Sequence, residues 1–213
     1  MLVKICGITN LEDALTAIDA GADVLGFNFW RQSRRYIAPK AARGIIDQLP
    51  AEVLTVGVFV NEESPDTVKQ ITREAGVRAL QLHGDEPPEY CSALKDQYVI
   101  KVFGVDEDFG PERVAQYDVA AVMLDTLDRK ARGGTGRVID WTIARRTREL
   151  APKLFLAGGL APENVGVAIA AVEPYAVDAC SALEASPGRK DAARVWAFVE
   201  AVRRANRKIK LIS

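Results

Sequence analysis

Cys6 and Asp125 are the two residues of this chain best suited to move protons. Cys6 lies in the β-branched run 3–8, which reads as a strand, and Asp125 follows the apolar run 122–124. A thiolate can remove a proton and a carboxylic acid can donate one, so these side chains could form an acid–base pair. The structural alternatives are a small buried cysteine and an aspartate that caps a helix or forms a turn. The pair can act only if the fold brings both strand ends together.

Strands and helices alternate along the chain, as judged by apolar periodicity and by turn residues. Expected strands cover residues 3–8, 23–29, 54–60, 79–83, 98–104, 120–126, 154–159 and 176–181. Expected helices cover residues 11–20, 39–49, 65–75, 87–95, a short segment after Pro111, 140–150, a segment opened by Pro162, and 191–205. Two helices have clear ends: Asn10 with Asp13 and then Gly21 for the first, and Ser64 and Gly76 for the third.

Eight strand-then-helix units within 213 residues match a single-domain (β/α)8 TIM barrel that spans residues 1–213. The alternative is an open, doubly wound parallel sheet, which usually has fewer strands. No G-x-G-x-x-G sequence follows the first strand, so a dinucleotide-binding unit lacks its fingerprint. The barrel is therefore the favoured fold.

Composition limits the possible partners. A net charge of −1 gives no overall basic field for nucleic acid or for an anionic membrane. Three cysteines and one histidine, His83, show no disulfide framework and no metal-ligand spacing. Because the sequence shows no signal peptide and no membrane-length apolar run, we expect a cytoplasmic protein that binds a small molecule. The sequence does not indicate an oligomeric state.

In a barrel, the carboxyl ends of all eight strands form one ring, where ligands bind. The expected ring consists of Cys6, Asn28 or Phe29, Asn61, His83, Gly104, Asp125, Gly158 with Gly159, and Ser181. This ring is too polar for packing alone. It brings Cys6 and Asp125 to one mouth, where a thiolate base can face a carboxylic acid.

A phosphate site is expected where strands seven and eight end. Gly158 and Gly159 offer backbone amides that an anion can approach closely, and Ser181 and Ala182 lie at the end of the next strand. The Gly–Gly pair alone could equally be a tight turn. Arg35, in the loop after strand two, could bind a carboxylate or phosphate through two parallel hydrogen bonds, or could simply be solvated.

Strand periodicity also predicts a buried ion pair. If Cys6 points into the barrel mouth, Lys4 points into the lumen one layer below, and Asp178 shares its face of strand eight with Cys180. Strands one and eight become neighbours when the barrel closes, and a buried ammonium needs a partner. We therefore expect a Lys4–Asp178 salt bridge beneath the active site. The alternative is that the long lysine side chain reaches bulk water.

The sequence resembles the phosphoribosylanthranilate isomerase family of tryptophan biosynthesis, in order and over almost the whole chain. The matching segments are 3–9, 26–29, 33–37, 56–59, 81–86, 124–125, 133–136 with Trp141, 157–164, 177–178 and 187–191. The most specific of these segments are Lys-Ile-Cys-Gly at 4–7 and Gln-Leu-His-Gly at 81–84, taken together.

The resemblance implies an isomerase that converts N-(5-phosphoribosyl)anthranilate to 1-(2-carboxyphenylamino)-1-deoxyribulose 5-phosphate by an Amadori rearrangement, without a metal or cofactor. It implies Cys6 as general base and Asp125 as general acid. We expect Cys6 to be a partly exposed thiol with a depressed pKa, unlike Cys91. Arg35 falls where the family places an arginine that contacts the anthranilate, and His83 is expected to bind substrate.

The chain departs from the family at two points. Arg34 stands where the family usually has proline, and Cys180-Ser181-Ala182 replaces a Ser-Ser-Gly type of sequence. Alanine keeps the backbone amide but narrows the allowed backbone angles. Two rival functions are the related isomerase of histidine biosynthesis, alone or in a bifunctional enzyme, and a phosphosugar-binding barrel without catalysis. The histidine-pathway isomerase generally uses an aspartate pair, whereas strand one here offers Cys6. A barrel that only binds phosphosugars would not need both Cys6 and Asp125.

Overall fold

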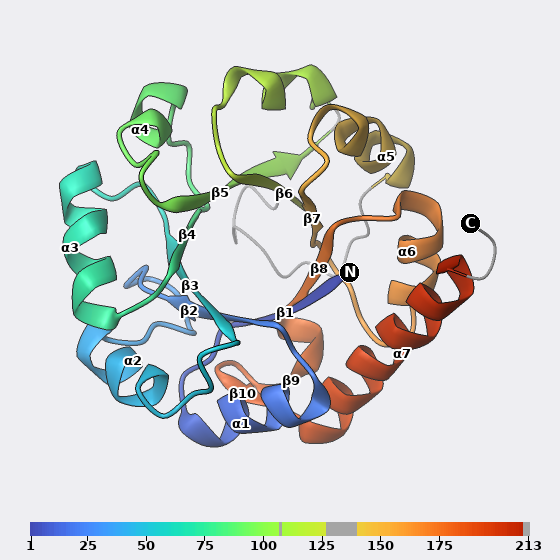
Figure 1. Cartoon of the computed structure of the whole chain (residues 1–213), viewed down its shortest axis with the longest axis horizontal. Helices are drawn as coiled ribbons and strands as arrows, with labels where there is room; N and C mark the ends of the chain where they lie inside the picture. Colours follow the sequence, from blue (N-terminus) through green and yellow to red (C-terminus); the bar gives the residue numbers. More distant parts are fainter. Residues whose placement is uncertain (107, 127–139, 211–213) are drawn as a thin grey trace.

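The computed structural model describes residues 1–106, 108–126 and 140–210. Eight parallel strands close into a barrel, and helices form a ring around it (Figure 1). The barrel strands are β1 (Leu2–Cys6), β2 (Val24–Asn28), β3 (Leu54–Phe59), β4 (Ala79–Leu82), β5 (Tyr98–Val105), β6 (Ala121–Thr126), β7 (Leu154–Leu156) and β8 (Ala176–Ala179). The predicted (β/α)8 fold is confirmed, and the open-sheet alternative is wrong.

Strand β1 closes the barrel because it pairs with β2 on one side and β8 on the other. On the β8 side, Lys4 lies opposite Asp178 and Ile5 lies opposite Ala179. On the β2 side, Cys6 lies opposite Gly26. This register brings the first and last strands together, so residues more than 170 positions apart in the chain share one layer of the lumen.

The outer ring consists of seven α-helices and one 3-10 helix in the described part of the chain, and a second 3-10 helix follows β8. They are α1 (Leu11–Ala20), α2 (Pro39–Ile46), α3 (Pro65–Ala75), α4 (Pro88–Ser92), η1 (Pro111–Gln116), α5 (Trp141–Leu150), α6 (Val165–Val172), η2 (Ser181–Leu183) and α7 (Ala192–Lys210). None of the helices in these residues is long and apolar enough to cross a bilayer.

The predicted helix ends of α1 and α3 are confirmed. The Asn10 Oδ1 accepts a hydrogen bond from the Asp13 amide at 2.9 Å, and Asn10 Nδ2 donates to the Asp13 carboxylate at 2.7 Å. The Ser64 hydroxyl accepts from the Thr67 amide at the start of α3. Gly21 and Gly76 end the two helices with positive φ angles, which glycine adopts without steric cost. Local capping therefore fixes where α1 leaves the end of β1.

Several predicted boundaries are wrong. Helix α6 begins at Val165 instead of directly after Pro162, because the Asn164 side chain binds back to the Ala161 amide and the Gly159 carbonyl and holds a turn there. Strands β7 and β8 end earlier than expected, so the Gly–Gly and Ser–Ala pairs lie just beyond them. Helix α4 is shorter than predicted and α7 is longer. A small antiparallel hairpin, β9 (Glu184–Ser186) with β10 (Arg189–Lys190), was not predicted.

Two apolar clusters hold the barrel together. The larger cluster lies between the strands and the surrounding helices and includes Phe27, Phe59 and Phe198, all fully buried. The smaller cluster consists of strand residues whose side chains point to the other face of the sheet, including Met123 and Phe155. Because strand side chains alternate between the two faces, this second cluster fills the lumen and supports the mouth from below.

Candidate active site

A buried ion pair forms the floor of the site. Lys4 Nζ donates to Asp178 Oδ1 at 2.8 Å, and the Lys4 side chain is completely buried. Burial acts to lower the pKa of Lys4, but the charges of Asp178 and Cys6 outweigh it and raise that pKa. Burial raises the pKa of Asp178 to about 6, against the attraction of Lys4. The predicted salt bridge is confirmed, and it places a fixed positive charge under Cys6.

Cys6 lies directly above this pair, at the last position of β1. A Cβ atom on Gly26 would lie 2.7 Å from Cys6 Sγ and 3.2 Å from Lys4 Nζ, so only glycine leaves room for both. The thiol is buried, with 8% of the residue exposed, which corrects the expectation of a partly exposed thiol. A hydrogen bond with the Cys180 thiol and the charges of Lys4 and Lys190 lower the pKa of Cys6 well below its ordinary value, although burial opposes them.

Asp125 lies near the end of β6 and contacts His83, which follows β4. The distance from His83 Nε2 to Asp125 Oδ2 is 3.4 Å, and the Thr126 amide donates to Asp125 Oδ1 at 2.7 Å. On its other side, His83 Nδ1 lies 3.0 Å from Gln81 Nε2. His83 is thus held between Gln81 at Nδ1 and Asp125 at Nε2. Gln81 thereby orients His83 toward the carboxyl group.

A cavity of about 50 Å³ unites Asp125 with the predicted phosphate residues. Its wall includes Gly158, Gly159, Ser181 and Ala182. Gly158 and Gly159 have φ angles of 83° and 66°, a region that glycine adopts freely. Asn164 Nδ2 donates to the Gly159 carbonyl at 2.9 Å. Because the peptide bond is planar, the Leu160 amide of the same peptide points away from Asn164. Cys180 and Asp178 also line this cavity.

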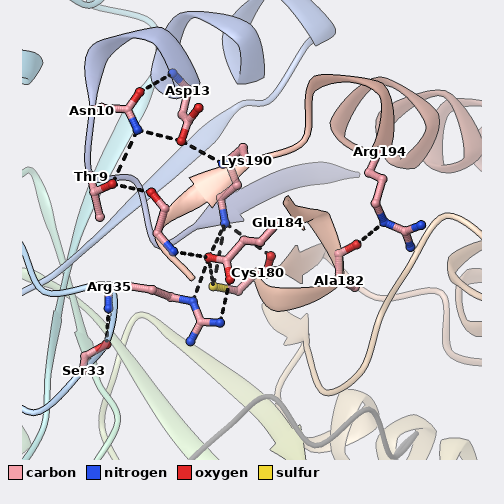
Figure 2. Close-up of polar contacts among 11 residues, drawn as sticks. Thr9, Asn10, Asp13, Ser33, Arg35, Cys180, Ala182, Glu184, Lys190 and Arg194 are labelled. Atoms are coloured by element: carbon pink, nitrogen blue, oxygen red, sulfur yellow. Dashed lines mark hydrogen bonds and ion pairs between the residues drawn. The ribbon is translucent and has the colours of Figure 1, made fainter. Parts of the chain in front are cut away.

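Arg35 does not stand alone in its loop. Its Nε and Nη2 atoms donate to the two carboxylate oxygens of Glu184 at 2.8 and 2.7 Å. Glu184 also accepts from Lys190 Nζ at 3.2 Å, and Figure 2 shows the three charged groups converging beside the Cys180 sulfur. Burial would raise the pKa of Glu184, but its bonds to Arg35 and the charge of Lys190 lower it. The solvated-arginine reading is wrong.

Sequence reasoning missed four residues of this site: Gln81, Cys180, Glu184 and Lys190. Cys180 had a usable signal, because strand register places it after Ala179, which lies opposite Ile5. Glu184 and Lys190 had none, since their partners come from the loop after β2 and from a hairpin that periodicity does not reveal. The matching segment 133–136, and the predicted loop 127–136 that contains it, lie outside the described residues.

Comparison with known proteins agrees with this arrangement. A family model described as N-(5'-phosphoribosyl)anthranilate (PRA) isomerase matches residues 3–201. A protein of that name from Desulforudis audaxviator is 50% identical over 206 residues, which is 96% of this chain and 98% of the relative.

Solved structures agree as well. The phosphoribosyl anthranilate isomerase of Thermotoga maritima has a TM-score of 0.88 and 43% identity, covering 95% of this chain and 99% of that one. A second isomerase structure holds reduced 1-(o-carboxyphenylamino)-1-deoxyribulose 5-phosphate, with a TM-score of 0.85, 42% identity, and coverage of 95% of this chain and 98% of that one. A thiol and a carboxyl group at one barrel mouth, together with these matches along nearly the whole sequence, establish that the chain belongs to the N-(5'-phosphoribosyl)anthranilate isomerase family.

Proposed function

We propose that this chain converts N-(5-phosphoribosyl)anthranilate to 1-(2-carboxyphenylamino)-1-deoxyribulose 5-phosphate, as the isomerase step of tryptophan biosynthesis, with Cys6 as general base and Asp125 as general acid. The observation that carries the proposal is the environment of Cys6. The thiol stands above a buried ammonium at the mouth of the barrel, so its thiolate form is favoured where a base is needed.

The reaction begins with two proton transfers, one to the ring oxygen of the ribose and one from C2. Asp125 donates a proton to the ring oxygen of the ribose, the bond from that oxygen to C1 breaks, and the nitrogen lone pair forms a Schiff base at C1. The Cys6 thiolate then removes the C2 proton, and the electron pair of the broken C2–H bond forms the C1–C2 double bond of an enolamine. Protonation of C1 and loss of the C2 hydroxyl proton give the ketone. The net change is an isomerisation, which these two residues can carry without any redox step.

His83 is assigned a positioning role. Its Nε2 faces Asp125, and Gln81 contacts its Nδ1. Held in this way, the imidazole keeps the carboxyl group of Asp125 directed at the mouth and stands within reach of a bound substrate. His83 is thus expected to influence both substrate binding and the proton donation by Asp125.

The two ends of the substrate are assigned to different groups at the mouth. The backbone amides of the segments 158–160 and 181–182 suit the phosphate, since they line one cavity beside Asp125. Arg35 suits the anthranilate carboxylate. Glu184 occupies the Nε and Nη2 edge of the guanidinium, and an arginine fork has five donor hydrogens, so donors remain for a second carboxylate.

Turnover of the purified chain tests the proposal. Freshly prepared N-(5-phosphoribosyl)anthranilate is added, the anthranilate-type fluorescence is followed, and the product is identified by mass spectrometry after borohydride reduction of its ketone. Saturable conversion to the carboxyphenylamino ketose supports the proposed function. Hydrolysis to free anthranilate at only the uncatalysed rate would contradict it. A cytoplasmic location remains a prediction.

A further inference from the structure

Cys180 is the feature of the site that the isomerase reaction does not require. It lies one residue beyond β8, where Ala179 is already opposite Ile5 of β1. Extending that register by one position places Cys180 opposite Cys6. Both side chains then share the face of Lys4 and Asp178, which form a direct contact two residues earlier.

Two further observations support a close approach of the two sulfurs. A Cβ atom on Gly7, the residue after Cys6, would lie 2.9 Å from Cys180 Sγ. The interaction between the two thiols is the largest influence on the pKa of each, lowering that of Cys6 and raising that of Cys180. The pair therefore divides its roles: Cys6 tends to be the thiolate and Cys180 the protonated thiol.

The backbone geometry suits a covalent bond between them. Neighbouring strands lie roughly 4.7–4.9 Å apart, and disulfides join Cα atoms that are roughly 4.4–6.8 Å apart. Opposed residues on one face of adjacent strands meet this requirement with little backbone movement. Cys180 lines the cavity beside Asp125 and Cys6 keeps 8% of its surface exposed, so a molecule of a few atoms can approach the pair from the mouth.

Charged groups surround the pair on both sides. Lys4 lies below Cys6, and Lys190 Nζ lies 3.9 Å from Cys180 Sγ (Figure 2). Asp178 neutralises Lys4, while Glu184 accepts from both Lys190 and Arg35. These cations favour a thiolate and a thiolate-like leaving group, which are the species that thiol–disulfide chemistry uses.

We propose that Cys6 and Cys180 form an oxidisable dithiol, which a small hydroperoxide closes into a reversible disulfide. The Cys6 thiolate attacks the distal peroxide oxygen, the O–O bond breaks, and protonation of the leaving oxygen gives an alcohol or water and Cys6 sulfenic acid. The Cys180 sulfur then attacks the Cys6 sulfur, and water leaves with the Cys180 proton. Overall, two thiols are oxidised by two electrons and one hydroperoxide is reduced.

The consequence for catalysis rests on the proposed function. A disulfide removes the Cys6 thiolate, so the base of the isomerisation is lost until a thiol reductant restores it. Cys180 would also protect Cys6, because a sulfenic acid captured as a disulfide is not oxidised further to the irreversible sulfinic acid.

Cys91 provides the internal control. It lies in α4, is completely buried, and burial raises its pKa to about 11, so it should not react. Cys91→Ala removes this third thiol and leaves both the site and the basal activity unchanged. Cys180→Ser removes the proposed partner and keeps a side chain of similar size. Each variant is compared with its own untreated rate.

The test treats the reduced, purified enzyme with hydrogen peroxide, quenches with catalase, and measures intact mass, cross-linked peptides and activity before and after dithiothreitol. Wild type and Cys91→Ala should lose two hydrogen masses and yield a peptide that joins Cys6 to Cys180. Their activity should fall by about two orders of magnitude or more and return with dithiothreitol. Cys180→Ser should instead gain oxygen atoms on Cys6, and prolonged exposure should make its loss of activity permanent.

Peroxide-treated wild type that carries oxygen on Cys6 without the cross-link, or that cross-links between chains, would overturn the dithiol. The mass measurements test the dithiol, and the activity measurements test Cys6 as the base, so the two proposals can fail separately. A Cys6–Cys180 cross-link in protein that keeps full activity supports the dithiol and contradicts Cys6 as the base.

Discussion

Replacing Lys4 by methionine tests the ion pair on which the site rests. The two charges are 2.8 Å apart, and 0% and 9% of their side chains are exposed. At an effective dielectric constant of about 20, their attraction is about 6 kcal/mol, and loss of the lysine desolvation cost offsets part of it. Leaving Asp178 buried without a partner should therefore cost about 3–5 kcal/mol. In a chain of this size that lowers Tm by roughly 6–20 °C.

The pH dependence has a definite sign. In the native protein, burial raises the pKa of Asp178 to about 6, above its ordinary value. The charge of Lys4 opposes this rise, so removing Lys4 raises the pKa further. As the pH falls from 7 to 5, the fraction of Asp178 that is still charged in Lys4→Met becomes protonated, and its burial cost declines. The same protonation weakens the pair in wild type. The stability difference between the two proteins should thus shrink on acidification.

Urea unfolding at pH 7 and pH 5 measures both effects. Lys69→Met is the matched control, because Lys69 pairs with Asp66 at 3.6 Å on an exposed helix face, and its loss should cost about 0.5 kcal/mol or less. Adding Asp178→Leu to Lys4→Met should restore most of the stability, since no unpaired charge remains. A cost for Lys4→Met no larger than that of Lys69→Met would refute the argument.

Three further predictions concern the mouth. Asp125→Asn should lower kcat by about two to four orders of magnitude with KM largely kept, and steady-state kinetics would reveal a change in KM alone if the residue only binds. Gly159→Asp should abolish substrate binding, whereas Gly44→Asp, where a Cβ meets nothing within 4 Å, should not; equal affinities would remove the phosphate assignment. Because its pKa is lowered, Cys6 should be alkylated by iodoacetamide at pH 7 far faster than Cys91, and the acid-side fall of kcat/KM should begin well below pH 9; an acid-side fall that begins near pH 9 would contradict this.

The parts of the fold that follow from local rules were predictable. Alternation of side chains predicts Lys4 in the lumen, and barrel closure predicts Asp178 as its partner, as the register of β1 and β8 confirms. The caps at Asn10 and Ser64 were equally local. The same alternation, carried one step further along β8, also pairs Cys180 with Cys6.

The rest depends on contacts that local patterns do not encode. Glu184 binds Arg35 across 149 positions of sequence, through a hairpin whose short strands give no periodic signal. Helix α6 starts late because the side chain of Asn164 competes with its own backbone, which the proline rule for helix starts does not consider. The depth of Cys6 was also misjudged, because burial depends on what the loops above a strand cover.

The kcat of Cys6→Ser, measured with saturating, freshly made N-(5-phosphoribosyl)anthranilate, tests the central claim most directly. Serine keeps the size of the side chain but is not ionised near neutral pH, so it cannot serve as the base. We predict a fall of about two to four orders of magnitude relative to wild type, with unchanged circular dichroism and little change in Tm. A kcat for Cys6→Ser within about threefold of wild type, which corresponds to less than about 1 kcal/mol in the barrier, would contradict the assignment of Cys6 as the base.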